Sequence, residues 1–153
     1  GEIPTELEGR WLRNGPNPES VDDPTTHHWF LGTGMVHGVR IRGGKAEWYK
    51  NRFVASPEDR AAGVFGANTN VGGFAGTTWA MVEGGQPPIE LDYDLNSLGT
   101  NRFNGTLDGP FTAHPKYDAA TGELHMAEID AGSASSVRGE LRATQPARSG
   151  GHA

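Results

Sequence analysis

The chain has 153 residues, enough for one domain with a modest hydrophobic core. Its 19 acidic and 13 basic residues give a net charge of −6, which argues against nucleic acid as a partner, since phosphate binding is built on clustered Lys and Arg. It contains no cysteine, which excludes disulfides, zinc ribbons and thiol catalysis, favours a reducing, cytoplasmic location and leaves His, Asp or Glu to hold any metal.

The first 54 residues divide into a region of loops and a hairpin. Residues 1–35 pack Gly, Pro, Asn and Asp around isolated aromatic side chains, which predicts loops. Residues 36–54 alternate apolar and polar side chains on both sides of Gly43-Gly44, which predicts a β-hairpin. The alternation slips at Trp48-Tyr49, so we expect either a bulge or a strand buried on both faces. A loop is predicted through residue 70.

The second half predicts one more strand, a meander and a second hairpin. Residues 76–85 read as the strand, 88–109 as turns around one short apolar stretch, and 113–129 as the hairpin, with its turn near Gly122. Residues 130–153 are rich in Ala, Ser, Gly and Arg without large periodic apolar residues, so a disordered tail is predicted. The expected organisation is therefore one folded region, 1–129, followed by this tail.

The glycine and proline content predicts an all-β fold. The chain has 23 Gly and 10 Pro, and no segment sustains the apolar stripe of a helix beyond a turn or two. Short strands with Gly-rich turns are typical of a sandwich, a barrel or a propeller, and periodicity does not choose among them. No apolar run approaches the roughly 18 residues of a membrane span, so no transmembrane segment is expected.

Most of the six histidines are interpreted as structural. The nine-residue spacing from His28 to His37 matches no metal-ligand pattern, so these two and His27 are expected to cap turns or stack beside aromatic rings. His125 alternates with apolar neighbours in the second hairpin and is expected to face solvent, and His152 lies in the tail.

His114 and Glu83 are the candidate site residues. Pro115 holds the residue before it in extended backbone, so His114 lies on a stiff segment suited to a metal ligand or to an ordinary strand end. Glu83 falls on the same strand face as Trp79 and Met81, where a carboxylate is costly to bury without a partner. That partner could be the far N–H of a metal-bound histidine; alternatively, Glu83 lies at the strand end and reaches water. Spacing alone leaves these alternatives even.

Six sequence blocks, in order over residues 1 to about 126, give the chain a resemblance to a known family. The blocks are IPTELEGRWLRNGPNP, HHWFLGTGMVHGVRIRGGKAEWYKNRFV, NTNV, AMVEGG, NGTLDGPFTAHPK and ATGELH. The chain resembles the carotenoid cleavage oxygenases, which include lignostilbene dioxygenases and the isomerohydrolase of the retinal pigment epithelium. It departs from the family's GDGM block, having Thr33 in place of Asp.

The resemblance implies a fold and a metal site. The family is a seven-bladed β-propeller with Fe(II) on its axis, held by four histidines, three of which hydrogen-bond to glutamates. His114 in TAHPK matches the first iron ligand, and Glu83 in AMVEGG matches the first of those glutamates. The chain has length for about three blades, because each takes about 40–45 residues. The other three histidine ligands have no counterpart in it.

The resemblance also implies a reaction, oxidative cleavage of a C=C double bond of a carotenoid, apocarotenoid or stilbene by an Fe(II)-dependent dioxygenase. Its partners are O2 and an apolar polyene or stilbene. The alternative is a catalytically inactive truncated propeller fragment, acting at most as an apolar-ligand or assembly module. The open edges of an incomplete propeller favour self-association.

Overall fold

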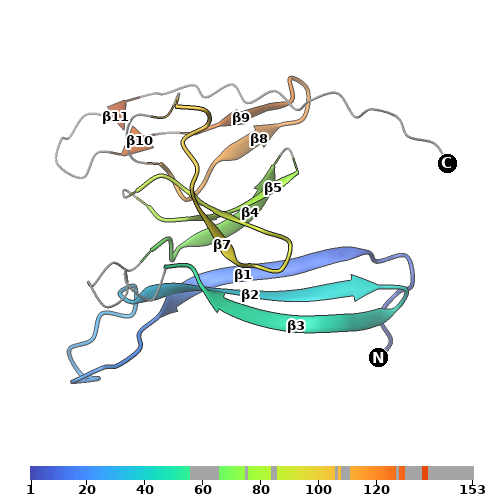
Figure 1. The fold of residues 1–153 in the computed structure, drawn as a ribbon, viewed down its shortest axis with the longest axis horizontal. Helices are drawn as coiled ribbons and strands as arrows, with labels where there is room; N and C mark the ends of the chain where they lie inside the picture. Colours follow the sequence, from blue (N-terminus) through green and yellow to red (C-terminus); the bar gives the residue numbers. More distant parts are fainter. Residues whose placement is uncertain are drawn as a thin grey trace.

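The computed structural model describes residues 1–55, 66–74, 76–83, 86–105, 107 and 111–126, together with the backbone of 128–129 and 136–137. These residues form antiparallel strands and no helix (Figure 1). The strands are β1 (Gly9–Asn17), β2 (Thr33–Arg42), β3 (Lys45–Phe53), β4 (Asn70–Phe74), β5 (Thr77–Met81), β6 (Ile89–Leu91), β7 (Ser97–Thr100), β8 (Lys116–Asp118), β9 (Glu123–His125), β10 (Glu128–Ile129) and β11 (Ser136–Val137). The all-β expectation is confirmed for the described residues.

The first sheet has the order β1-β2-β3 and contains the predicted hairpin. Gly43 and Gly44 have φ of 53° and 73°, the left-handed conformation that a tight two-residue hairpin turn requires. Opposite Arg40 and Ile41 the register shifts, so that Glu47 has no partner in the pairing and forms a bulge. This bulge lies one residue before the predicted phase slip.

The prediction of loops throughout residues 1–35 is wrong for β1. Gly9–Asn17 pairs residue by residue with β2, although the segment contains two glycines and a proline. In this sheet β1 has a partner on one side only, and Pro16 is tolerated because an edge strand does not need every N–H for the ladder.

The second sheet has the order β4-β5-β6-β7, so each strand pairs with its neighbour in sequence. The strand predicted at 76–85 is confirmed as β5, though shorter. β4 lies largely in residues 71–74, for which no strand was predicted, because Val71-Gly72-Gly73 has a weak strand pattern. The apolar stretch of the predicted meander became β6, and β7 completes the sheet.

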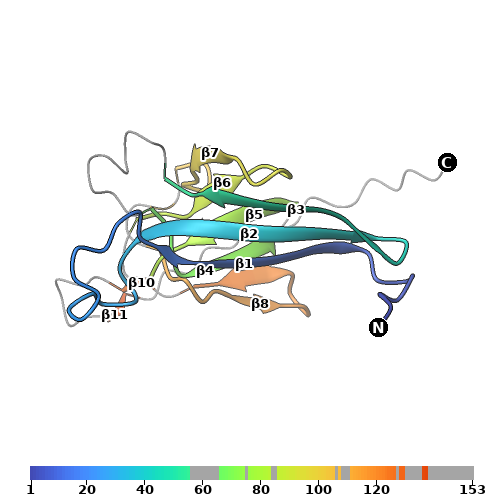
Figure 2. The same ribbon diagram turned by 90° about the horizontal axis from the view of Figure 1, so that it is seen from below.

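The sheets are stacked (Figures 1 and 2). Two hydrophobic clusters lie between them. The cluster between the first and second sheets contains buried residues from both and from the β6–β7 turn; these are Val36, Val54, Ala67, Ala80, Leu91 and Leu95. The cluster between the second sheet and the β8–β9 hairpin is richer in aromatic residues; it comprises Phe74, Trp79, Met81, Leu107, Phe111, Ala113 and Leu124. The second cluster anchors the segment that carries His114.

The β8–β9 hairpin confirms the second predicted hairpin, and Gly122 in its turn has φ of 74°. The predicted disordered tail, 130–153, lies outside the described residues except for Ser136–Val137, which pairs with Glu128–Ile129.

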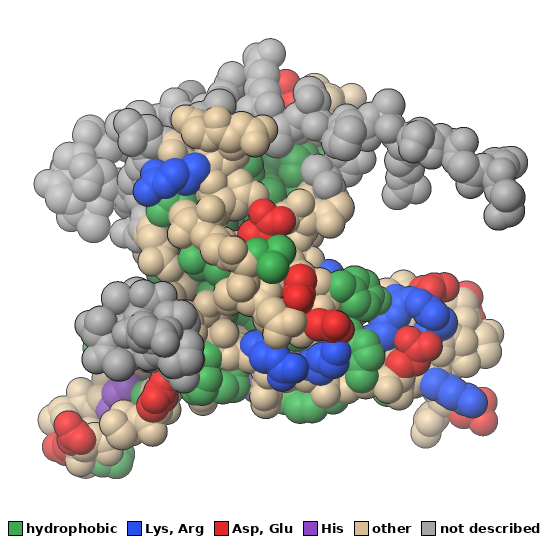
Figure 3. All heavy atoms as spheres, viewed as in Figure 1, with side chains coloured by type: hydrophobic (Ala, Val, Ile, Leu, Met, Phe, Trp, Pro, Cys, Tyr) green, Lys and Arg blue, Asp and Glu red, His purple; other side chains and the backbone are tan. Residues whose placement is uncertain are grey.

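Charged side chains of opposite sign lie next to one another on the face shown in Figure 3. Arg40, whose side chain is only 8 % exposed, pairs with Glu8 at 2.9 Å and Glu47 at 3.4 Å. Lys50 pairs with Asp94 at 2.6 Å. A buried guanidinium group needs such partners, so Arg40 serves the fold.

The turn between β6 and β7 depends on Asp92. Its carboxylate accepts the backbone N–H and the side-chain Nδ2 of Asn96, both at 2.8 Å. The turn places Leu95, fully buried, in the left-handed region at φ 70°. The hydrogen bond from the Asn96 side chain, opposed by partial burial and aided by backbone N–H groups, holds the pKa of Asp92 below its usual value of 3.8.

We expect Asp92→Asn to lower the free energy of unfolding by about 1 kcal/mol at neutral pH. A carboxyl group whose pKa is lower in the folded protein than in the unfolded chain stabilises the fold fully at pH values above its unfolded pKa. This stabilisation is lost as the pH falls through its folded pKa. The difference in free energy of unfolding between wild type and variant should therefore be constant above about pH 5 and shrink as the pH falls below about 4. Denaturant unfolding across this range measures it, and a difference that persists unchanged at pH 3 contradicts the role given to Asp92.

Candidate metal centre

Glu83 lies just beyond the end of β5. Trp79 and Met81, which precede it on the strand, are 4 % and 2 % exposed. Both belong to the aromatic-rich cluster between the second sheet and the β8–β9 hairpin. The Glu83 side chain is 38 % exposed, because it stands where the strand has ended. The carboxylate therefore reaches the surface, and it also has partners within the protein.

His114 lies on the segment that enters β8. Phe111, 1 % exposed, anchors this segment by stacking on Phe103 at 5.6 Å between ring centroids and by an edge contact with Trp79. After the buried Thr112 and Ala113, the chain emerges, and the His114 side chain is 63 % exposed. Pro115 then restricts the backbone on the other side. A buried anchor before it and a proline after it hold the imidazole at the surface.

The structure brings Glu83 and His114 together. Nδ1 of His114 lies 2.8 Å from Oε2 of Glu83, across 31 residues of sequence. The same oxygen accepts the backbone N–H of Ala113 at 3.0 Å, and the Thr112 hydroxyl lies 3.3 Å from Oε1. The Thr112 oxygen also accepts the His114 backbone N–H at 3.1 Å. One carboxylate thus contacts three consecutive residues of the segment.

These contacts determine which imidazole nitrogen carries the proton. Burial raises the pKa of Glu83, but hydrogen bonds from His114, Ala113 and Thr112 outweigh it, so the pKa lies below the usual 4.5. Glu83 is therefore ionised at neutral pH and can only accept. Nδ1 of a neutral His114 must then be the donor, which leaves a lone pair on Nε2. This is the arrangement in which carboxylates orient metal-binding histidines.

The pair fits a metal as one part of a ligand set. A neutral imidazole nitrogen suits iron and other transition metals. The described residues contain no group of three or more His, Cys, Asp or Glu that could hold a metal ion. A complete centre around His114 therefore needs donors from beyond the described residues or from another chain.

Three other histidines of the described region, His28, His37 and His125, have contacts separate from Glu83. His28 lies against Phe30, at 5.4 Å between ring centroids. Nδ1 of His37 lies 2.6 Å from the Tyr49 hydroxyl. Burial, together with the positive charge of Arg13, lowers the pKa of His37. His125 lies 3.7 Å from Glu123.

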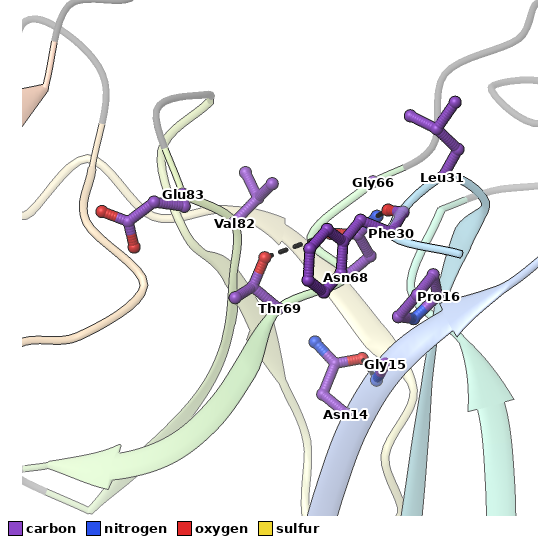
Figure 4. Close-up of a pocket in the computed structure, with 10 residues that line it drawn as sticks. All are labelled: Asn14, Gly15, Pro16, Phe30, Leu31, Gly66, Asn68, Thr69, Val82 and Glu83. Atoms are coloured by element: carbon purple, nitrogen blue, oxygen red, sulfur yellow. Dashed lines mark hydrogen bonds between the residues drawn. The ribbon is translucent and has the colours of Figure 1, made fainter. Parts of the chain in front are cut away.

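A cleft of about 560 Å³ ends at Glu83. In Figure 4, Glu83 lies at one end of the cleft and its carboxylate points away from Phe30 and Leu31 at the other end. The remaining lining residues come from β1, from the segment before β4 and from the end of β5; they are Asn14, Gly15, Pro16, Gly66, Asn68, Thr69 and Val82. The volume is typical of small-molecule sites.

Sequence reasoning missed the residues that hold the site together. Thr112 is the first residue of the TAHPK match, but no local pattern marks it as a partner of Glu83. Asn70 reaches the site across 43 residues of sequence, with Nδ2 2.7 Å from the Ala113 carbonyl oxygen. A contact between such distant segments leaves no signal in a single sequence.

The described residues form no helix, so none of them belongs to a helix that could span a membrane.

Comparison with known proteins identifies the family. A family profile described as "Retinal pigment epithelial membrane protein" matches residues 1–149. The chain is 49 % identical over 140 residues to a carotenoid cleavage oxygenase of Mycobacterium tuberculosis, covering 82 % of this chain and 28 % of that protein.

Two solved structures share the fold. A lignostilbene dioxygenase of Pseudomonas brassicacearum matches with a TM-score of 0.69 and 27 % identity, over 84 % of this chain and 32 % of that one. A cobalt-substituted apocarotenoid oxygenase of Synechocystis matches with a TM-score of 0.67 and 28 % identity, over 83 % of this chain and 34 % of that one. The chain thus spans about a third or less of the length of these proteins. It belongs to the retinal pigment epithelial membrane protein family, the family of the carotenoid cleavage oxygenases.

Proposed function

We propose that this chain supplies one histidine ligand, His114, to the Fe(II) centre of a dioxygenase that cleaves a C=C double bond of a carotenoid, apocarotenoid or stilbene. The observation that carries the proposal is the 2.8 Å contact between His114 Nδ1 and Glu83, which turns the Nε2 lone pair outward. The names of the relatives support the substrate classes, and the cobalt-substituted relative supports a metal in this family.

Each residue of the pair has a separate part in this proposal. His114 would hold the iron through Nε2. Glu83 would keep the proton on Nδ1 and would hold the imidazole ring in its orientation. Bound Fe(II) supplies the activation of O2 that an organic side chain cannot provide. The apolar cleft beside Glu83 would accept part of an apolar substrate and exclude water from it.

The proposal extends to the architecture. The four-stranded antiparallel sheet β4–β7, with a packed sheet on either side, has the form of a propeller blade. We propose that the stacked sheets are consecutive blades of a seven-bladed propeller that this chain fills in part. A second copy of the chain, paired through open sheet edges, is one source of the further metal donors.

Oxygen-dependent cleavage tests the function. The chain, loaded with Fe(II) without oxygen, is mixed with O2 and either an apocarotenal or a hydroxystilbene. We expect one O2 to be consumed for each double bond split into two carbonyl groups. His114→Ala should abolish the reaction, whereas His125→Ala, which removes an exposed imidazole on β9, should leave it intact. Absence of cleavage by the folded wild-type chain would instead favour a non-catalytic module, because the described residues contain no group of three or more His, Cys, Asp or Glu that could hold a metal ion.

A further inference from the structure

The residue that precedes His114, Ala113, is held by distant side chains at both its N–H and its carbonyl oxygen. Ala113 is fully buried and lies outside the strands, so its polar groups are not part of a sheet ladder. Its N–H donates to Glu83 Oε2 at 3.0 Å. Its carbonyl oxygen accepts Nδ2 of Asn70 at 2.7 Å. These two groups belong to the peptide bonds on either side of the Ala113 Cα, so the backbone is held both before and after this atom.

Asn70 is itself held in one orientation. It is the first residue of β4 and pairs with Met81 of β5, two residues before Glu83. Its Oδ1 accepts the backbone N–H of Val71 at 2.8 Å. An N–H donor must face the amide oxygen, so the amide nitrogen is the end that faces Ala113.

The first sheet supports Asn70 from behind. Nδ2 of Asn14, on β1, donates to the backbone carbonyl oxygens of Asn70 at 3.0 Å and Ala67 at 2.9 Å. A chain of side-chain hydrogen bonds thus runs from β1 through the start of β4 to the peptide before His114. It connects three parts of the fold that are far apart in sequence.

We propose that Asn70 is a positioning residue for His114, acting through the Ala113 carbonyl. The inference rests on the proposed function, since a ligand needs its direction held within a fraction of an ångström. Glu83 contacts the imidazole directly and also holds the Ala113 N–H, so a rotation of the backbone about Ala113 would disturb both contacts. Asn70 opposes that rotation from the other side. If Asn70 had only a structural role, it would hydrogen-bond the Ala113 carbonyl oxygen, and its replacement would not change the His114 imidazole.

The test measures the tautomers of His114 in the metal-free chain by long-range ¹H–¹⁵N NMR at about pH 8. Asn70→Asp keeps the acceptor for Val71 and loses the donor to Ala113; Asn70→Ala loses the donor without adding charge. In both we expect the minor Nε2–H tautomer to rise roughly threefold or more as the Glu83 contact loosens. Asn51→Asp, an exposed change of equal charge on β3, should leave the tautomers as in wild type.

Unchanged tautomers in folded Asn70→Asp and Asn70→Ala would overturn the proposal. If neither variant folds, a through-hydrogen-bond coupling from Asn70 Nδ2 to the Ala113 carbonyl carbon is measured in the wild type, and its absence overturns the proposal as well. The outcome is separate from that of the proposed function. If the Asn70 variants change the tautomers of His114 but the wild-type chain binds no iron, the positioning role of Asn70 is supported and the metal centre is refuted. If the wild-type chain binds iron but the tautomers do not change, the metal centre is supported and the role of Asn70 is refuted.

Discussion

Gly34→Ala should lower the free energy of unfolding by about 3 kcal/mol or more, a large part of the stability of an ordinary domain. A Cβ on Gly34 would lie 2.1 Å from the carbonyl oxygen of Ala67 and 2.7 Å from its carbonyl carbon. Both are backbone atoms of a fully buried residue, so no side-chain rotation relieves the clash. The two segments would have to separate, which would open the cluster between the first and second sheets.

Gly15→Ala is the matched control, on the neighbouring strand of the same sheet. A Cβ at Gly15 would meet no atom within 4 Å, and its backbone is not left-handed. We expect this control to change the free energy of unfolding by less than about 1 kcal/mol. Denaturant unfolding of both variants makes the comparison, and a Gly34→Ala protein as stable as the Gly15→Ala protein would show that β2 is not packed against Ala67 as described.

Those elements that local chemistry specifies were predictable from sequence. The β2–β3 hairpin follows from alternating side chains and a Gly43-Gly44 turn with φ above zero at both residues. The β8–β9 hairpin follows in the same way from Gly122. In each case the residues that pair are close in sequence, so a short window contains the whole signal.

Two strands whose own sequences have a weak strand pattern were not predictable. β1 contains Gly15 and Pro16, and it is a strand because it pairs along its whole length with β2. β4 contains Gly72 and Gly73, and it forms because Thr77–Met81 pairs with it. The local propensity of both segments is overridden by tertiary pairing.

The candidate site was predictable in part. Alternation placed Glu83 on the face of Trp79 and Met81, and Pro115 indicated a stiff segment at His114. Their contact spans 31 residues, and spacing could not choose between a partnered and a solvated carboxylate. The site has both features, because Glu83 stands at the strand end beside the incoming segment. The support from Asn70 had no local signal at all.

The second large effect concerns the metal. His114→Ala should reduce bound iron to background, because this substitution removes the imidazole whose Nδ1 lies 2.8 Å from the Glu83 carboxylate and whose Nε2 is left to bind a metal. Glu83→Gln should keep the fold and weaken iron binding by roughly 10- to 100-fold, as is usual when the partner of a ligand is lost. His125→Ala, an exposed histidine 3.7 Å from its own glutamate, is the control for non-specific binding.

The measurement that tests the account most directly is the iron content of the purified chain after anaerobic loading with Fe(II), beside His114→Ala, Glu83→Gln and His125→Ala. We predict near-stoichiometric iron in wild type and His125→Ala, less in Glu83→Gln and none above background in His114→Ala. Equal iron in wild type and His114→Ala would contradict the assignment of His114 as a metal ligand.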